Sequence, residues 1–287
     1  MSDTAAAIDV RDLRKRYGDF EAVRGIDISV RKGEVFGLLG PNGAGKTTTV
    51  EILEGYRARS GGEVSVLGCD PGRRGRELRQ QIGIVLQSGG IYGHITPREA
   101  LRHWASFYPH PRDVEEVIAL AGLHGAADVR SRRLSGGQLR RLDFALALVG
   151  DPELIFLDEP TTGFDPSARR SAWDVIAGLR DLGKTIFLTT HYMDEAEHLA
   201  DRIAVIAVGR VVAEGTPQTL GGRDRMTVTI RFTLPTGIGP RELPAGLSPL
   251  AERGPAGTTF IRSESPLVHV QMLAEWALGK GLDLPDL

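Results

Sequence analysis

The segment GLLGPNGAGKTTTVEIL, residues 37–53, constrains the fold of this chain more than any other. Residues 40–47 match the pattern G-x-x-x-x-G-K-[ST], and they lie between an apolar run and a helix-like segment, which is the context that the pattern requires. Glycines allow the backbone to curl so that successive N–H groups point at phosphate oxygens, and the helix that follows adds its positive end. The segment therefore predicts a phosphate-binding loop between a strand and a helix.

Two side chains of this loop indicate which phosphates it holds. Lys46 brings a full charge to the β- and γ-phosphates, and Thr47 offers a hydroxyl to a Mg²⁺ ion that bridges them. A chance glycine-rich turn is the alternative, but the matching strand and helix disfavour it. We expect a nucleoside triphosphate to contact Gly40, Pro41, Asn42, Gly43, Ala44, Gly45, Lys46, Thr47 and Thr48.

The rest of the N-terminal two thirds predicts an α/β fold with a parallel sheet. LIFLDEP and KTIFLTTH are continuous apolar runs, which is typical of parallel strands covered on both faces, and helix-like segments at 167–183 and 193–202 follow them. Residues 47–56 predict a helix that breaks near Gly61 and Gly62. Helical periodicity from about residue 94 to 129 predicts a helical insertion.

Length and composition bound the domain organisation. The 287 residues, 41% hydrophobic and 25% charged, are enough for one ordinary domain and a small second one. A composition shift at residues 221–225 marks the boundary, so we expect a nucleotide-binding domain over 1–221 and a small α+β domain over 222–287. In the second domain, 226–232 and 258–263 predict strands and 267–281 a helix.

Charge and apolar content exclude several function classes. A net charge of -2 lacks the basic surplus that a nucleic-acid partner demands. The N-terminus has no apolar core for a signal peptide and no run of about 18 apolar residues occurs, so we expect any membrane contact to be indirect. Cys69 is the only cysteine, which suits a reducing compartment and predicts a small buried thiol.

Two further segments carry candidate functional residues. In RLSGGQLRRLDFALAL, Ser135 is placed to cap a helix, and Gly136 and Gly137 expose backbone N–H groups that an anion can meet. In LIFLDEP, Asp158 suits a Mg²⁺ shell and Glu159 suits a base that polarises an attacking water. Taken alone, the segment around Ser135 predicts only a capped helix, and the segment around Asp158 predicts only a solvated strand end. Because a phosphate-binding loop lies upstream, both segments can instead be interpreted as parts of a nucleotide site.

The order of these motifs resembles that of the ATPase subunit of an ATP-binding cassette (ABC) transporter. The sequence contains, in the family's order, GPNGAGKTT, LSGGQ, LIFLDEP and GFD, and the likeness covers about residues 6–220. It implies a P-loop NTPase fold of the ABC type, with a parallel core, an antiparallel β subdomain and a helical signature subdomain at about 88–150. Phe164 departs from the leucine that is usual in the family.

The resemblance also implies roles for individual residues. Tyr17 would stack on adenine, and Gln87 would reach the metal or water beside the membrane partner. Asp165 would link the two sites of a dimer, and His191 would contact the γ-phosphate. The signature residues would be Ser135, Gly136, Gly137 and Gln138.

A narrower likeness to bacterial exporters of the daunorubicin-resistance type implies a partner and a cargo. Such subunits lie on the cytoplasmic face of the membrane, pair with an integral membrane subunit and export drugs or lipid-like compounds, which implies multidrug export and antibiotic resistance. They form a homodimer with MgATP at the interface. Similar exporters usually continue into a leucine-rich acidic helix beyond the point where this sequence ends.

Two other classes compete with a transporter subunit. A soluble ABC ATPase of translation or DNA maintenance usually fuses two cassettes or inserts a long coiled coil, and this sequence has neither feature. A GTPase is disfavoured because no N-K-x-D guanine motif occurs. His191 and His198 are seven residues apart and are expected on one helix face, but without a third ligand they do not predict zinc.

Overall fold

The computed structural model divides into two compact units, Met1–Leu220 and Gly221–Leu287. It describes residues 6–73, 75–86, 92–220, 228–235, 237–254 and 258–263, with scattered residues between 269 and 284.

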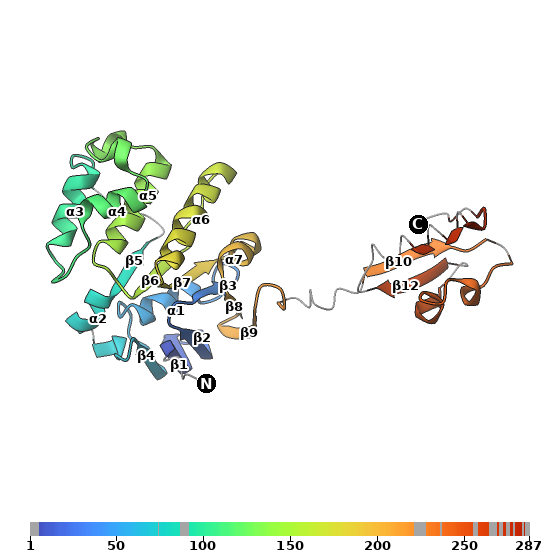
Figure 1. Cartoon of the computed structure of the whole chain (residues 1–287). Helices are drawn as coiled ribbons and strands as arrows, with labels where there is room; N and C mark the ends of the chain where they lie inside the picture. Colours follow the sequence, from blue (N-terminus) through green and yellow to red (C-terminus); the bar gives the residue numbers. More distant parts are fainter. Residues whose placement is uncertain are drawn as a thin grey trace. The chain divides into compact units, whose positions relative to one another are not determined.

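The first unit is built on a six-stranded sheet in the order β5-β6-β7-β3-β8-β9 (Figure 1). Its strands are β3 (Val35–Leu39), β5 (Ile82–Val85), β6 (Leu154–Asp158), β7 (Thr185–Thr190), β8 (Arg202–Ala207) and β9 (Arg210–Gly215). The neighbours from β5 to β8 pair in parallel, and only β9 runs antiparallel, in a hairpin with β8. The predicted α/β fold with a parallel sheet is confirmed. The carboxyl ends of β3, β6 and β7 therefore meet at one edge.

A second, antiparallel sheet covers the helix that follows the phosphate loop. It has the order β2-β1-β4, with β1 (Ala6–Tyr17), β2 (Phe20–Arg31) and β4 (Gly61–Val66). Its buried side chains join those of α1 (Lys46–Leu53) and of the main sheet in one hydrophobic cluster. Packing between two sheets fixes the start of α1, and with it the loop before it.

The remaining helices form two groups. Helices α6 (Pro166–Asp181) and α7 (Met193–Leu199) pack with main-sheet residues in a second cluster. Helices α3 (Pro97–Ala105), α4 (Val114–Leu120) and α5 (Gly136–Leu148) share a cluster of their own. These three lie together at one end of the unit in Figure 1, which agrees with the predicted helical insertion. The short helix α2 (Arg76–Gln81) leads into β5.

Three local predictions are wrong. Helix α1 ends at Leu53 rather than near Gly61, because Gly55 adopts a left-handed φ of 80° that terminates the helix. His191 lies before α7 and not on it, so it shares no helix face with His198, which stacks instead on Trp173. Cys69 is only partly buried.

The second unit contains a three-stranded antiparallel sheet in the order β10-β12-β11. Its strands are β10 (Val228–Thr233), β11 (Ala251–Arg253) and β12 (Thr258–Ser263). Two of them match the strands predicted at 226–232 and 258–263. Phe232, Leu247, Ile261 and Leu273 form its core. The helix predicted at 267–281 falls partly outside the described residues.

Candidate nucleotide site

The phosphate loop joins β3 to α1, and two of its glycines are required by their surroundings. A Cβ atom on Gly40 would lie 2.3 Å from the carbonyl oxygen of Ile206, so no larger residue fits. Gly45 has a φ of 108°, and a Cβ there would lie 2.8 Å from the carbonyl oxygen of Ala22. The neighbouring β hairpins therefore shape the loop as well as its own sequence.

Lys46 is the first residue of α1 and is almost fully buried, with 4% of its surface exposed. Its Nζ donates hydrogen bonds to the carbonyl oxygens of Gly40 at 2.8 Å and Pro41 at 3.2 Å. The same atom lies 3.2 Å from Glu159 Oε1. The ammonium group is thus held over the loop by the loop itself and by one carboxylate.

Asp158 and Glu159 stand at the carboxyl end of β6, as predicted for the strand. Asp158 Oδ1 accepts a hydrogen bond of 2.6 Å from the hydroxyl of Thr189 on β7. Glu159 adopts a left-handed φ of 46°, and its backbone N–H donates to Thr189 as well. A non-glycine residue in this region is strained, which means that the surrounding structure imposes the direction of the Glu159 side chain.

The environment moves the pKa values of the two carboxyl groups in opposite directions. Burial raises the pKa of Asp158, and the nearby charge of Glu159 adds to the effect. Burial would also raise the pKa of Glu159, but hydrogen bonds with Lys46 and Thr162 outweigh it and hold that pKa below its ordinary value. A bound cation would compensate the unfavourable burial of Asp158, which makes its carboxylate a fitting ligand for Mg²⁺.

His191 approaches Glu159 from the segment between β7 and α7. Its Nδ1 lies 3.3 Å from Glu159 Oε2, in a geometry that makes no hydrogen bond, and this buried nitrogen has no other hydrogen-bond partner within the described part of the chain. Glu159 Oε2 accepts instead from the hydroxyl of Thr162 at 3.0 Å. His191 therefore lines the same hollow as Glu159, with its buried Nδ1 turned toward the carboxylate.

These side chains border a hollow of about 580 Å³ over the loop. Residues that line it are Phe20, Ala22, Asn42, Gly43, Gly45, Lys46, Thr47, Thr48, Glu159, Thr162 and His191. Sequence reasoning missed Phe20, although an aromatic residue directly after the turn at residues 18–19 was a usable signal; it is 60% exposed. The structure thus brings most of the predicted loop residues together with Glu159 and His191.

Tyr17 does not line this hollow. It is the last residue of β1, and it is 40% exposed. Its ring packs against Arg57 and Lys15, whose charged groups lie 5.3 and 5.0 Å from the ring centre. Gln87 lies outside the described residues.

The signature residues surround a different hollow, of about 630 Å³. Ser135 caps α5 in a reciprocal pair: its hydroxyl accepts from the N–H of Gln138 at 3.2 Å, and the Gln138 side chain accepts from the N–H of Ser135 at 2.9 Å. Asp165 lines the same hollow and caps α6, accepting from the N–H groups of Ser167 and Ala168. These two N–H groups lower the pKa of Asp165.

The two hollows have no lining residue in common among the described residues. Each offers backbone donors at the start of a helix, α1 in one case and α5 in the other. One chain therefore presents two separate surfaces with helix-start donors, and Glu159 lines the first while Asp165 lines the second.

Arg140 connects the two surfaces and was not predicted from the sequence. Its buried guanidinium donates to the carbonyl oxygen of Pro160 at 3.0 Å and to that of Leu86 at 2.5 Å. It joins the signature helix to the segment after Glu159 and to the end of β5. No charge pattern in the sequence distinguished it from the neighbouring exposed arginines.

Known proteins resemble this chain in sequence. Residues 23–162 match the family model described as ABC transporter. Nod factor export ATP-binding protein I of Burkholderia orbicola is 44% identical over 222 residues, which is 76% of this chain and 73% of that protein. The protein of the same name from Sinorhizobium fredii is 40% identical over 272 residues, 92% of this chain and 78% of that one.

Solved structures give the same result. The structure titled cbiO1 from Clostridium perfringens, part of the ABC transporter complex cbiONQ, has a TM-score of 0.69 and 28% identity, and it covers 77% of this chain and 93% of that chain. An ATP-binding cassette of an ABC transporter in its ADP conformation has a TM-score of 0.65 at 24% identity, covering 77% and 93%, and supports the fold alone.

The fold and the site define an ATP-binding cassette. The chain belongs to the ABC transporter family of ATP-binding proteins and is an ATPase of that family. The predicted resemblance and the P-loop NTPase fold are therefore confirmed. Within the described residues, no helix has both the length and the apolar character needed to cross a membrane.

Proposed function

We propose that this chain is the ATP-hydrolysing subunit of a bacterial ABC exporter and that it works as a homodimer with MgATP at the interface. One observation supports the dimer. In a single chain, the hollow over the loop (the phosphate hollow) and the hollow around Ser135 and Asp165 (the signature hollow) are two separate surfaces. Paired head to tail, each phosphate hollow faces the partner copy's signature hollow. The ABC ATP-binding domain would span 1–221, with its helical subdomain at about 88–150, and the accessory domain 222–287.

In this proposal the residues of the phosphate hollow hold and position ATP. The loop from Gly40 to Thr48 surrounds the phosphates with N–H groups, and Lys46 carries the main positive charge. Thr47 and Asp158, with Gln87, would hold Mg²⁺, which neutralises charge on the β- and γ-phosphates when bound. Tyr17 would lie against the adenine.

Glu159 and His191 would perform the chemical step. Glu159 accepts a proton from the attacking water as the new P–O bond forms and the bond between the γ-phosphorus and the bridging oxygen breaks, which releases ADP and inorganic phosphate. His191, which lines the hollow over the loop, would hold a γ-phosphate oxygen. The partner copy would contribute Ser135, Gly136, Gly137 and Gln138, and Asp165 would link the two sites.

A Glu159→Gln variant tests this proposal. The amide keeps the side-chain shape but cannot take the proton, so MgATP binding should survive while turnover falls by roughly 10²-fold or more. The uncleaved ATP should then hold the chain as a dimer in light scattering with MgATP, but not with ADP. Adding Ser135→Arg should abolish that dimer and leave binding to the monomer intact.

Two results would contradict the assignments. Normal hydrolysis by Glu159→Gln would remove Glu159 from the catalytic role. A variant that binds ATP, does not hydrolyse it and stays monomeric at every concentration would contradict a dimer that forms through ATP alone.

Export rests on similarity to relatives that are named Nod factor export ATP-binding proteins. We propose a drug or lipid-like cargo that is moved by a separate integral membrane subunit, with the cassette on the cytoplasmic face of the membrane. A multidrug-export or antibiotic-resistance role would follow only if that cargo is a drug. The docking surface of the membrane subunit would lie beside Gln87, next to Leu86 at the end of β5.

A pull-down from membranes separates this function from the second candidate. A polytopic membrane protein as the stoichiometric partner supports transport. A ribosomal or DNA-bound partner would favour a soluble ABC ATPase of translation or DNA maintenance.

A further inference from the structure

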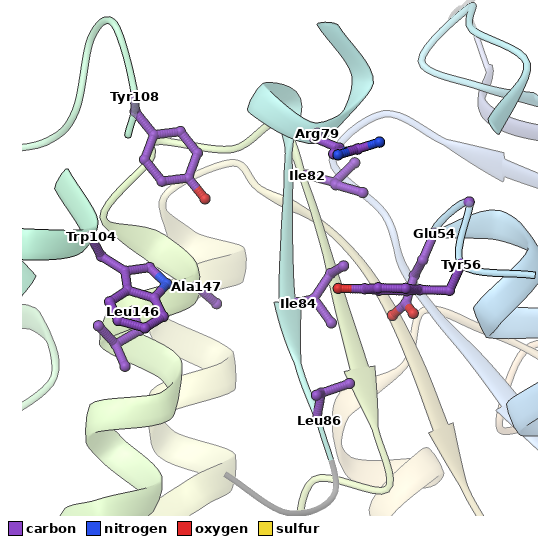
Figure 2. A pocket seen from close by; sticks show the side chains of 11 residues that line it. Glu54, Tyr56, Arg79, Ile82, Ile84, Leu86, Trp104, Tyr108, Leu146 and Ala147 are labelled. Atoms are coloured by element: carbon purple, nitrogen blue, oxygen red, sulfur yellow. The ribbon is translucent and has the colours of Figure 1, made fainter. Parts of the chain in front are cut away.

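A groove of about 440 Å³ lies between the main sheet and the helical insertion. It is lined by Glu54, Gly55, Tyr56, Arg79, Ile82, Ile84, Leu86, Trp104, Tyr108, Leu146 and Ala147. Figure 2 shows Glu54 and Tyr56 directed toward β5 from one side, with Trp104 and Leu146 on the opposite side. The walls are mainly apolar and aromatic, and Glu54 is the one acidic residue among the lining residues described.

Glu54 is the residue that makes this groove unusual. Only 6% of its surface is exposed, and its Oε1 is buried with no hydrogen-bond partner within the described part of the chain. Burying a polar atom without a partner destabilises the folded chain, because the atom loses its hydration and gains nothing in return. The residue follows α1 directly, and its backbone N–H donates to the carbonyl oxygen of Val50 at 2.9 Å, so its backbone is held at the end of the helix.

Among the described residues, no positive charge acts on the pKa of this carboxyl group, so nothing there compensates its ionisation. Burial raises its pKa to about 8, and the negative charges of Asp158 and Glu51 add to the effect. Arg79 lines the groove, but it is not among the groups that influence this pKa. A structural role alone would be served better by a leucine or a hydrogen-bonded amide.

We propose that Glu54 recognises an arginine or lysine of the membrane subunit, which inserts into this groove when the two subunits assemble. This inference rests on the proposed function. The apolar walls suit the aliphatic stem of such a side chain, and the carboxyl group at the inner wall, which ionises when a positive charge is beside it, suits the charged end. An apolar or acidic side chain would leave Glu54 buried and unpaired, so the groove discriminates between membrane subunits.

The position of Glu54 also connects docking to the nucleotide site. Helix α1 begins at Lys46, which faces the phosphates, and is followed directly by Glu54, which faces the groove. Leu86, at the other wall, accepts the hydrogen bond from Arg140 of the signature helix through its carbonyl oxygen. A side chain that pairs with Glu54 therefore contacts the ends of elements that position both the phosphate hollow and the signature hollow.

The test uses the full chain and the membrane subunit that co-purifies with it. Glu54→Gln and Glu54→Arg are compared with Glu77→Arg, which changes an exposed acidic residue on α2 that does not line the groove. We expect Glu54→Gln to weaken assembly about 30-fold, which corresponds to a loss of about 2 kcal/mol, and Glu54→Arg to abolish it. Glu77→Arg should assemble normally. ATP binding by each isolated variant shows that it is folded.

Charge reversal provides a readout that a purely structural role would not give. Suppressors of Glu54→Arg are selected in a library of membrane-subunit variants, and we expect an arginine or lysine of that subunit to be replaced by glutamate or aspartate. Assembly of folded Glu54→Arg at wild-type affinity would overturn the inference, and so would suppressors that never change a basic residue. If the wild-type chain has no membrane partner, the proposed function itself fails, and the two failures are thus distinguished.

Discussion

Replacing Glu54 by glutamine should make the isolated chain more stable at alkaline pH. The pKa of Glu54 is about 8 in the folded chain, compared with 4.5 for the free group. The folded state therefore holds a proton that the unfolded state releases between these values. Stability from this group is fully present below pH 4.5 and is lost as the pH rises through 8.

The magnitude follows from the same two values. At about 1.36 kcal/mol for each unit of pKa, the difference bounds the loss of unfolding free energy at about 5 kcal/mol. Because the groove is open to water, hydration offsets part of the cost of ionising Glu54. We therefore expect a total loss of unfolding free energy of about 2–3 kcal/mol. The amide that Glu54→Gln introduces cannot ionise, so the variant should lack this loss.

Urea unfolding at about pH 5.5, 7.0 and 8.5 measures the effect. Trp104 lines the groove, so tryptophan fluorescence follows the relevant transition, and a Trp104→Phe background identifies it. Part of this loss has already occurred at the lowest pH, which is above 4.5, so from the lowest to the highest pH wild type should lose about 1–1.5 kcal/mol more than Glu54→Gln. Glu77→Gln serves as the exposed control and should follow wild type. Parallel pH profiles for wild type and Glu54→Gln would refute the reasoning.

Four further outcomes are expected for the nucleotide site and the second unit. Lys46→Ala should weaken MgATP binding by about 30-fold or more, because a charged hydrogen-bond donor to phosphate is lost; titration with a fluorescent ATP analogue measures it. His191→Ala should bind ATP nearly normally but turn over about 10²-fold more slowly in a phosphate-release assay. Phe20→Ala should weaken ATP binding by several-fold, about 1 kcal/mol, if its ring contacts the nucleotide in the hollow that it lines; unchanged affinity contradicts this. Removal of residues 222–287 should leave ATP binding intact and alter assembly, whereas loss of binding by a folded product would show that the boundary is wrong.

The sequence predicts the parts of the site that depend on local pattern. The glycine spacing of the loop, the apolar run that ends at Asp158 and the cap at Ser135 each follow from a few consecutive residues. The parallel sheet was predictable for the same reason, because continuous apolar runs are typical of buried parallel strands.

Features that depend on contacts between distant segments were not predictable in this way. The groove around Glu54 is formed by residues after α1, on β5, and on α3 and α5, and no local pattern marks an acid that lacks a partner. The placement of His191 also depends on tertiary contacts, and its spacing from His198 suggested a helix face that does not exist. The early end of α1 was different: Gly55 is a local signal that was available and was outweighed by Gly61 and Gly62.

The contact between Lys46 and Glu159 connects the phosphate loop to the basicity of the Glu159 carboxylate. Lys46 holds the pKa of Glu159 below its ordinary value, which makes the carboxylate a weak base. A γ-phosphate in the loop competes for the same ammonium group, and when Lys46 turns to the phosphate, burial acts on Glu159 with less opposition and its pKa rises. A base whose pKa moves toward the working pH accepts a proton from water more effectively. If Glu159 is the base, as proposed above, binding of ATP would thus make it a stronger base, and the strained backbone at Glu159 would keep the carboxylate in place while its partner changes.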